Sequence, residues 1–229
     1  MKKRIITPLL FLLVMAGFSQ NLTFDVHGKY THPVKKEKLV QARLLSDIIP
    51  SYPAKWIMSY VATEVRVIRD GDTAMAAGVN DALSAEQINI LQTTDLGTDI
   101  VINIRYKYNN PVTDNLEDGS MNYSATVVPE TEAEYPGGYQ QMTQYLKENA
   151  IDNISEEISG QIQPVVVGFT VNEKGKIADA QLSGTSGDPE TDELLLEVIN
   201  KMPKWKPAED SKGIKVKQEF ELSVGSGGC

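Results

Sequence analysis

The stretch IKVKQEFELSV, residues 214–224, decides the fold of the C-terminal half of this chain. Apolar and polar side chains alternate along it with a period of two. Such alternation predicts an antiparallel strand with one buried face and one solvated face. The inward set is Ile214, Val216, Gln218, Phe220, Leu222 and Val224, and the outward set includes Lys215, Lys217, Glu219 and Glu221.

The residues before this strand show the order helix, strand, strand, helix. A helix is expected over 139–151, strands over 165–171 and 177–183, and a second helix that begins at Asp188-Pro189 and ends at Pro203. With the closing strand, this order predicts an α+β module: a three-stranded antiparallel sheet with two helices on one face. We place this module at residues 129–229.

Residues 20–128 predict a smaller, mostly β module with one or two short helices. Residues 24–31 are extended in character, and 35–48 carry a helical apolar stripe. Ser84 and Gln87 form a capping-box pattern that starts a short helix. The remaining expected strands are 55–68, 73–79, 99–108 and 121–128.

The first 19 residues have the pattern of an export signal. Lys2, Lys3 and Arg4 precede an apolar run over 5–18, with small Gly17 and Ser19 before Gln20. Fourteen residues of helix reach about 21 Å, short of the roughly 30 Å core of a bilayer. We therefore expect cleavage and a periplasmic protein, with a retained inner-membrane anchor as the alternative.

Charge and residue usage exclude several function classes. The formal net charge is −9, and removal of residues 1–19 lowers it to about −12. A net field of this sign does not attract nucleic acid or anionic lipid. Two histidines, one cysteine and the lack of phosphate, dinucleotide or nucleophile-elbow motifs predict no catalytic residues, no metal and no cofactor.

Four ordered blocks of the second module resemble the C-terminal domain of Bacteroidetes TonB-type energy transducers. They are the Tyr135-Pro136-Gly137-Gly138 opening, the 165–177 hairpin, the signature Met202-Pro203-Lys204-Trp205-Lys206-Pro207 and the strand over 213–222. The likeness covers about 100 residues. Tyr135, Pro136, Gly137, Gly138, Met202, Pro203, Trp205 and Pro207 are expected to serve structure rather than contact a partner.

The resemblance implies that an outer-membrane receptor, or another envelope protein, adds a strand to the edge of the sheet. If the closing strand is that edge, its backbone groups bind the partner. Lys215, Lys217, Glu219 and Glu221 then lie beside the bound strand. The alternative is that these charges protect the edge from aggregation.

Residues 50–108 show a shorter resemblance to the last periplasmic domain of the gliding and type IX secretion protein GldM. It rests on Leu83-Ser84-Ala85-Glu86-Gln87 and Leu96-Gly97-Thr98-Asp99-Ile100. Two functions therefore stay open: a TonB-like protein in energy-coupled transport, and a non-transducing structural adaptor of an envelope machine. A retained anchor would add inner-membrane motor proteins as partners, and a disulfide through Cys229 would give a homodimer.

Overall fold

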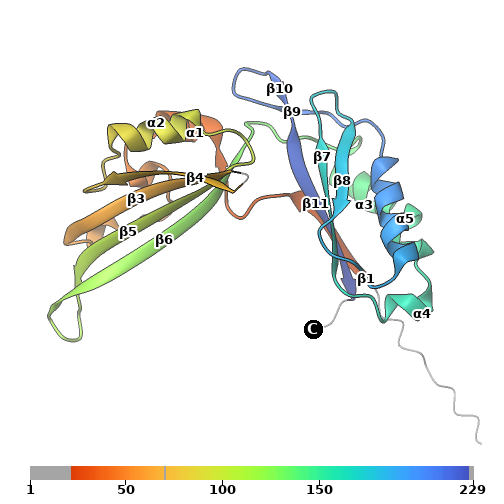
Figure 1. Cartoon of the computed structure of the whole chain (residues 1–229), viewed down its shortest axis with the longest axis horizontal. Helices are drawn as coiled ribbons and strands as arrows, with labels where there is room; N and C mark the ends of the chain where they lie inside the picture. The colour runs from red at the N-terminus through yellow and green to blue at the C-terminus, as the bar shows by residue number, and fades with distance from the viewer. Residues whose placement is uncertain (1–21, 70, 227–229) are drawn as a thin grey trace, which may run out of the picture.

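A computed structural model describes residues 22–69 and 71–226 of the chain. The fold is mixed α+β, with more strand than helix, arranged as two modules side by side (Figure 1). The expected export signal, residues 1–19, and Cys229 lie outside the described residues.

The first module is a five-stranded sheet of order β2-β6-β5-β3-β4. Its strands are β2 (Pro33–Lys35), β3 (Ser59–Arg69), β4 (Asp72–Gly78), β5 (Asp99–Asn109) and β6 (Leu116–Val128). All neighbours pair antiparallel except β2 and β6, which pair parallel. Alternate residues of the central strands are fully buried, among them Val65, Ile100, Ile102 and Ile104.

Two helices, α1 (Lys36–Gln41) and α2 (Ala85–Thr93), lie over one face of this sheet (Figure 1). The capping box is confirmed: Ser84 N donates to Gln87 Oε1 at 2.9 Å, and Gln87 N donates to Ser84 Oγ at 3.2 Å. The expected helix over 35–48 is wrong beyond Gln41. Backbone N–H groups of Arg43 and Leu44 donate to the Asp47 carboxylate, which replaces the helix with a 3₁₀ turn, Leu45–Asp47.

The second module is a four-stranded sheet of order β1-β11-β7-β8. Three strands are those expected: β7 (Val165–Val171), β8 (Ile177–Leu182) and β11 (Gln218–Ser226). The fourth, β1 (Leu22–Gly28), overlaps the extended segment 24–31 that was expected in the first module, and that placement is wrong. It pairs antiparallel with β11 from Leu22↔Ser226 to Gly28↔Phe220.

The physical reason for this placement lies in the side chains of β1. Val26 is 6% exposed, and the partly buried Leu22 and Phe24 pack on the same core cluster as Phe220 and Leu222. Because these residues alternate along the strand, all three reach one face of the sheet. β1 thus completes the core of the second module.

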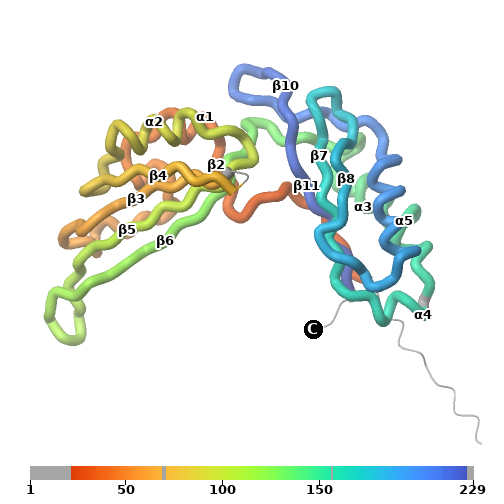
Figure 2. Tube along the Cα trace, in the orientation of Figure 1, coloured from red at the N-terminus to blue at the C-terminus, as the bar shows by residue number. Residues whose placement is uncertain are grey.

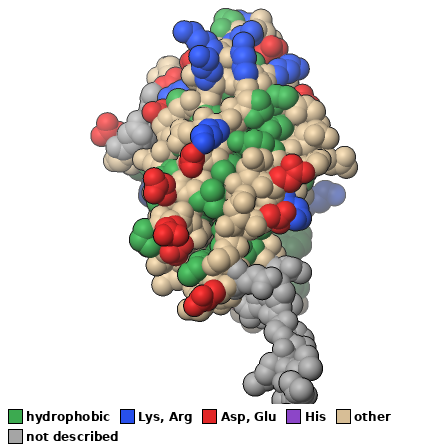
Figure 3. Space-filling model, turned by 90° about the vertical axis from the view of Figure 1, so that its right-hand side faces the viewer, with side chains coloured by type: hydrophobic (Ala, Val, Ile, Leu, Met, Phe, Trp, Pro, Cys, Tyr) green, Lys and Arg blue, Asp and Glu red, His purple; other side chains and the backbone are tan. Residues whose placement is uncertain are grey.

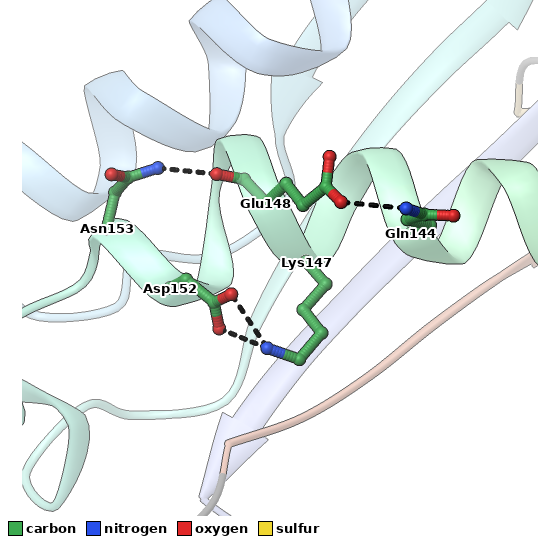
Figure 4. A network of polar contacts seen from close by, with 5 residues as sticks. All are labelled: Gln144, Lys147, Glu148, Asp152 and Asn153. Carbon is green, nitrogen blue, oxygen red and sulfur yellow. Dashed lines mark hydrogen bonds and ion pairs between the residues drawn. The ribbon is translucent and has the colours of Figure 1, made fainter.

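Helices α3 (Gly138–Asn149) and α5 (Pro189–Asn200) flank the four-stranded sheet, with a short α4 (Glu156–Ser159) between them in sequence (Figure 1). Figure 4 shows how α3 ends. Lys147 pairs with the Asp152 carboxylate, and Asn153 Nδ2 donates to the carbonyl oxygen of Glu148 at 3.0 Å. These contacts hold a 3₁₀ turn, Ile151–Asn153, against the last turn of the helix.

Two segments, a turn at 29–32 and an extended stretch at 129–134, carry the chain between the modules (Figure 2). The second is tied to residues 206–209 by bridges at Thr131↔Glu209 and Glu134↔Lys206. A small two-stranded ribbon of β9 (Ala208–Glu209) and β10 (Lys215–Val216) follows. In the loop between these two strands, Ser211 Oγ donates to Glu37 Oε2 of α1 at 2.9 Å. Within residues 22–69 and 71–226, no helix combines the length and apolar character that a bilayer crossing requires.

We predict that Val26→Ala destabilises the second module by roughly 1–3 kcal/mol, because it removes buried apolar volume from its core. Thr23→Ala, on the exposed face of the same strand, should cost no more than about 0.5 kcal/mol. Trp205 is 3% exposed in the second core, whereas Trp56 of the first module is 75% exposed. Fluorescence-detected urea unfolding of both variants in a Trp56→Phe background therefore reports on the second module. Equal midpoints would contradict the placement of β1.

Candidate functional site

The strand expected to be the open edge, β11, is enclosed on both sides. β7 pairs with it along one side and β1 along the other. Lys29 N also donates to Glu219 O at 3.0 Å, which extends the β1 side of the ladder by one residue. The prediction that β11 is a free edge is therefore wrong: its backbone groups are occupied by the chain's own N-terminal strand.

The four side chains expected beside a bound strand have different positions. Glu219 and Glu221 lie in β11, on the face opposite the helices. Lys217 precedes that strand, and Lys215 lies in β10 opposite Glu209. Three of the four side chains are exposed and Glu221 is half-buried.

The structure brings these four residues to a cleft between the modules. One hollow of about 400 Å³ is lined by Lys215, Lys217 and Glu219 together with Asp95 and Glu173. A second, of about 460 Å³, is lined by Glu219 and Glu221 together with Lys29, Tyr30, Gly97, Asp99 and Thr126. The sequence did not identify the cleft residues in segments 29–31 and 95–99. They lie near β11 because the chain turns at 29–32 and places the first module beside the second.

The cleft carries charges of both signs. Lys29 Nζ lies 3.6 Å from Glu219 Oε2, and Thr126 Oγ1 donates to Asp99 Oδ1 at 2.7 Å. Burial, with the nearby Glu132 carboxylate, raises the pKa of Tyr30. Within the described residues, no three His, Cys, Asp or Glu side chains gather closely enough to hold a metal ion. Such a lining suits hydrogen bonds and ion pairs with a polar chain.

The open edge of the second sheet belongs to β1. Lys29 and Glu219 form a hydrogen-bonded pair, so by alternation His27, Asp25 and Thr23 also point their backbone groups at β11. The N–H and C=O groups of Leu22, Phe24 and Val26 then point outward. No strand of the described chain pairs with this side of β1.

β8, at the other border, is a poorer template. Its register against β7 shifts between Gly168 and Thr170, and Asp179 has a φ of 52°. Irregularities of this kind protect an edge from further pairing. β1 has no proline, no lysine and no irregularity in its pairing over seven residues. At its middle, Tyr139 Oη donates to Asp25 Oδ1 at 2.7 Å, and this hydrogen bond raises the pKa of Tyr139.

The signature residues around Trp205 form an aromatic cluster inside the second module. The Trp205 ring lies 5.5 Å from that of Tyr135, 6.0 Å from Phe169 and 5.1 Å from Phe220. Met202 and Pro207 are also buried, whereas Pro203 and Pro136 are exposed. The indole N–H of Trp205 has no hydrogen-bond partner among the described residues.

Gly137, Gly138 and Gly175 have backbone conformations with a positive φ. A Cβ at Gly175 would lie 2.0 Å from the carbonyl oxygen of Trp205, and φ there is 76°. Gly137, before α3, has φ 81°, and a Cβ there would lie 2.6 Å from Cγ of Gln141. Gly138 also has a positive φ, of 80°. Only glycine adopts these conformations without strain.

Comparisons with protein-family models, with curated proteins and with solved structures found no match to this chain.

We predict that Trp205→Phe costs about 1–2 kcal/mol and Trp205→Ala about 3–5 kcal/mol of folding stability. The first substitution keeps an aromatic ring in the core and breaks no hydrogen bond, because the indole N–H has no partner in the part of the chain that the structure describes. Urea unfolding followed by circular dichroism measures both. A Phe variant as unstable as the Ala variant would show that the N–H has a partner on which the core depends.

Proposed function

We propose that this chain is an exported, non-catalytic binding protein that captures an extended segment of an outer-membrane receptor or transporter by strand addition. In this proposal it works as a TonB-like component of energy-coupled transport in the periplasm. The observation that carries the proposal is the outer border of β1, with which no strand of the described chain pairs, at the edge of a sheet that has helices on one face.

The docking strand in this proposal is β1 and not β11. An added strand would take its main-chain hydrogen bonds from Leu22, Phe24 and Val26. Its side chains would alternate between the helix-bearing side of the sheet and the side of Thr23 and Asp25. The Tyr139–Asp25 contact lies beside this border, so a partner segment has a hydroxyl and a carboxylate available for selectivity.

The resemblance of the second module to TonB-type C-terminal domains supports the class of partner. The signature residues around Trp205 and Gly175 are those on which that resemblance rests, and they shape the core and its turn. We infer a TonB-like arrangement in which β7, β8 and β11 form the family sheet and β1 is an addition to it.

A structural adaptor of an envelope machine, of the gliding or type IX secretion type, is the second candidate. The enclosure of β11 favours it, because the strand that the resemblance assigns to the receptor is already paired. In addition, β1 and β11, far apart in sequence, lie in one sheet. The modules are tied to each other by segments 29–32 and 129–134 and by the Ser211–Glu37 hydrogen bond. Such an arrangement suits a fixed spacer.

Photo-crosslinking in cells tests docking at β1 and distinguishes the transport function from the structural adaptor. A photoreactive phenylalanine analogue at Thr23, on exposed β1, should form adducts, and the same analogue at exposed Gln181 of β8 is the matched control. Mass spectrometry of the adducts identifies the partner. A receptor or transporter supports the transport function, and a secretion or gliding component supports the adaptor. Absence of adducts at Thr23, or the same adducts at Gln181, would overturn docking at β1.

We also predict that the mature protein begins at Gln20, because Gly17 and Ser19 fit the positions before a signal-peptidase cut. Mass spectrometry of the protein purified from its native envelope measures this directly. A retained Met1 in the inner-membrane fraction would contradict cleavage and would favour an anchored transducer.

A further inference from the structure

Four exposed lysines meet at one end of the second module. Lys174 and Lys176 belong to the turn between β7 and β8, and Lys204 and Lys206 flank buried Trp205. Trp205 N donates to the carbonyl oxygen of Gly175 at 2.8 Å, so the two segments lie side by side. We refer to these four residues as the lysine cluster. Figure 3 shows Lys and Arg side chains gathered at the upper end of this side of the molecule.

A carboxylate residue faces the lysine cluster, since Glu134 lies opposite Lys206 in a backbone bridge. Within the described residues none of the four lysines forms an ion pair, whereas Lys201 nearby is paired with Glu197. The adjoining segments 129–134, 206–212 and 215–219, with the 172–177 turn itself, also carry three lysines, Lys212, Lys215 and Lys217, and seven acidic residues: Glu130, Glu132, Glu134, Glu173, Glu209, Asp210 and Glu219. Asp210 Oδ1 accepts the backbone N–H groups of Lys212 and Ile214, so this carboxylate is engaged in its own turn. The positive charge is thus concentrated in the four lysines of the cluster and not in an excess of lysine over the surrounding segments.

The backbone fixes where the lysines stand. Asn172 Oδ1 accepts the N–H groups of Lys174 and Lys176, both at 3.0 Å, and the Gly175–Trp205 hydrogen bond holds the second segment against this turn. The cluster therefore sits on the outside of two turns rather than inside a groove. A convex, basic end of this kind suits a broad surface better than a small ligand.

The choice of lysine also bears on the partner. The arginines of the chain are at positions 4, 43, 66, 69 and 105, so all basic residues of the second module are lysines. Arginine forks bind single phosphates or carboxylates in fixed bidentate geometry, whereas lysine is a hydrated point charge suited to a diffuse array of anions. Trp205, the aromatic residue of this segment, is buried and offers no stacking surface to a nucleic-acid base.

We propose that the lysine cluster docks the protein on a phospholipid surface that carries anionic headgroups. The net charge, −9 for residues 1–229 and about −12 without residues 1–19, does not prevent this, because charges more than about 8 Å away are screened at physiological ionic strength. Each lysine near an anionic surface strengthens binding about fivefold. This contact goes beyond the capture of a partner segment: it would hold the second module at a membrane while the β1 edge remains free.

Vesicle co-sedimentation of the mature chain, residues 20–229, tests the proposal. The probes are phosphatidylcholine vesicles with and without 30% phosphatidylglycerol, at 0.1 M and 0.5 M NaCl. We expect binding to the anionic vesicles only, weakened at least tenfold by the higher salt. The quadruple variant K174Q/K176Q/K204Q/K206Q should lose at least tenfold in affinity. K38Q/K55Q/K107Q/K147Q, with the same change in net charge on other surfaces, should bind as the unchanged chain does.

Three outcomes would overturn the proposal: no binding to anionic vesicles, equal binding to neutral ones, or equal losses in the two quadruple variants. A polyglutamate peptide is the second probe. If it binds through the lysine cluster while the vesicles do not, the partner is an acidic protein segment and not a membrane. Circular dichroism of both variants checks that their fold is unchanged. Neither variant alters β1, so crosslinking at Thr23 remains an independent test of the proposed function.

Discussion

The pairing of β1 with β11 is the interaction on which the second module depends. Seven residues of β1, at the start of the described chain, pair with β11, at its end. Leu22, Phe24 and Val26 close the core over Phe220 and Leu222, and the ladder occupies the backbone groups that would otherwise form an open rim. The same pairing forces the chain to leave β1 at Gly28 and cross to the first module, so the position of the cleft follows from it.

This constraint changes how a partner can approach. Because β11 is paired on both sides, the outer border of β1 is the edge of the sheet with regular pairing geometry. The charged residues Lys215, Lys217, Glu219 and Glu221, which were expected at the edge, line the cleft instead. A partner segment on β1 would lie on the far side of that strand from Glu219 and Lys217. The cleft and the edge are therefore two separate surfaces, one polar and walled by both modules, the other a row of backbone groups.

Much of the fold follows from the sequence, and the exceptions have physical causes. Local sequence patterns predict several elements that the structure contains: the capping box at Ser84, the strands β5, β7 and β8, and the helix start at Asp188-Pro189. The apolar alternation of Leu22, Phe24 and Val26 identifies a strand, but alternation does not tell which sheet receives it. That choice depends on a pairing between residues about 200 positions apart. The candidate site was misplaced for the same reason, since one added neighbour turns an edge strand into an inner one.

Hydrogen exchange at individual amides of β11, followed by NMR, tests the central claim most directly. The N–H groups of Glu221 and Ser223 point toward β1, and that of Leu222 points toward β7. If β1 encloses β11, all three amides are protected and exchange slowly. If β11 is an open edge, Leu222 alone is protected, while Glu221 and Ser223 exchange near the rate of an unstructured chain, and that alternating result would contradict the account.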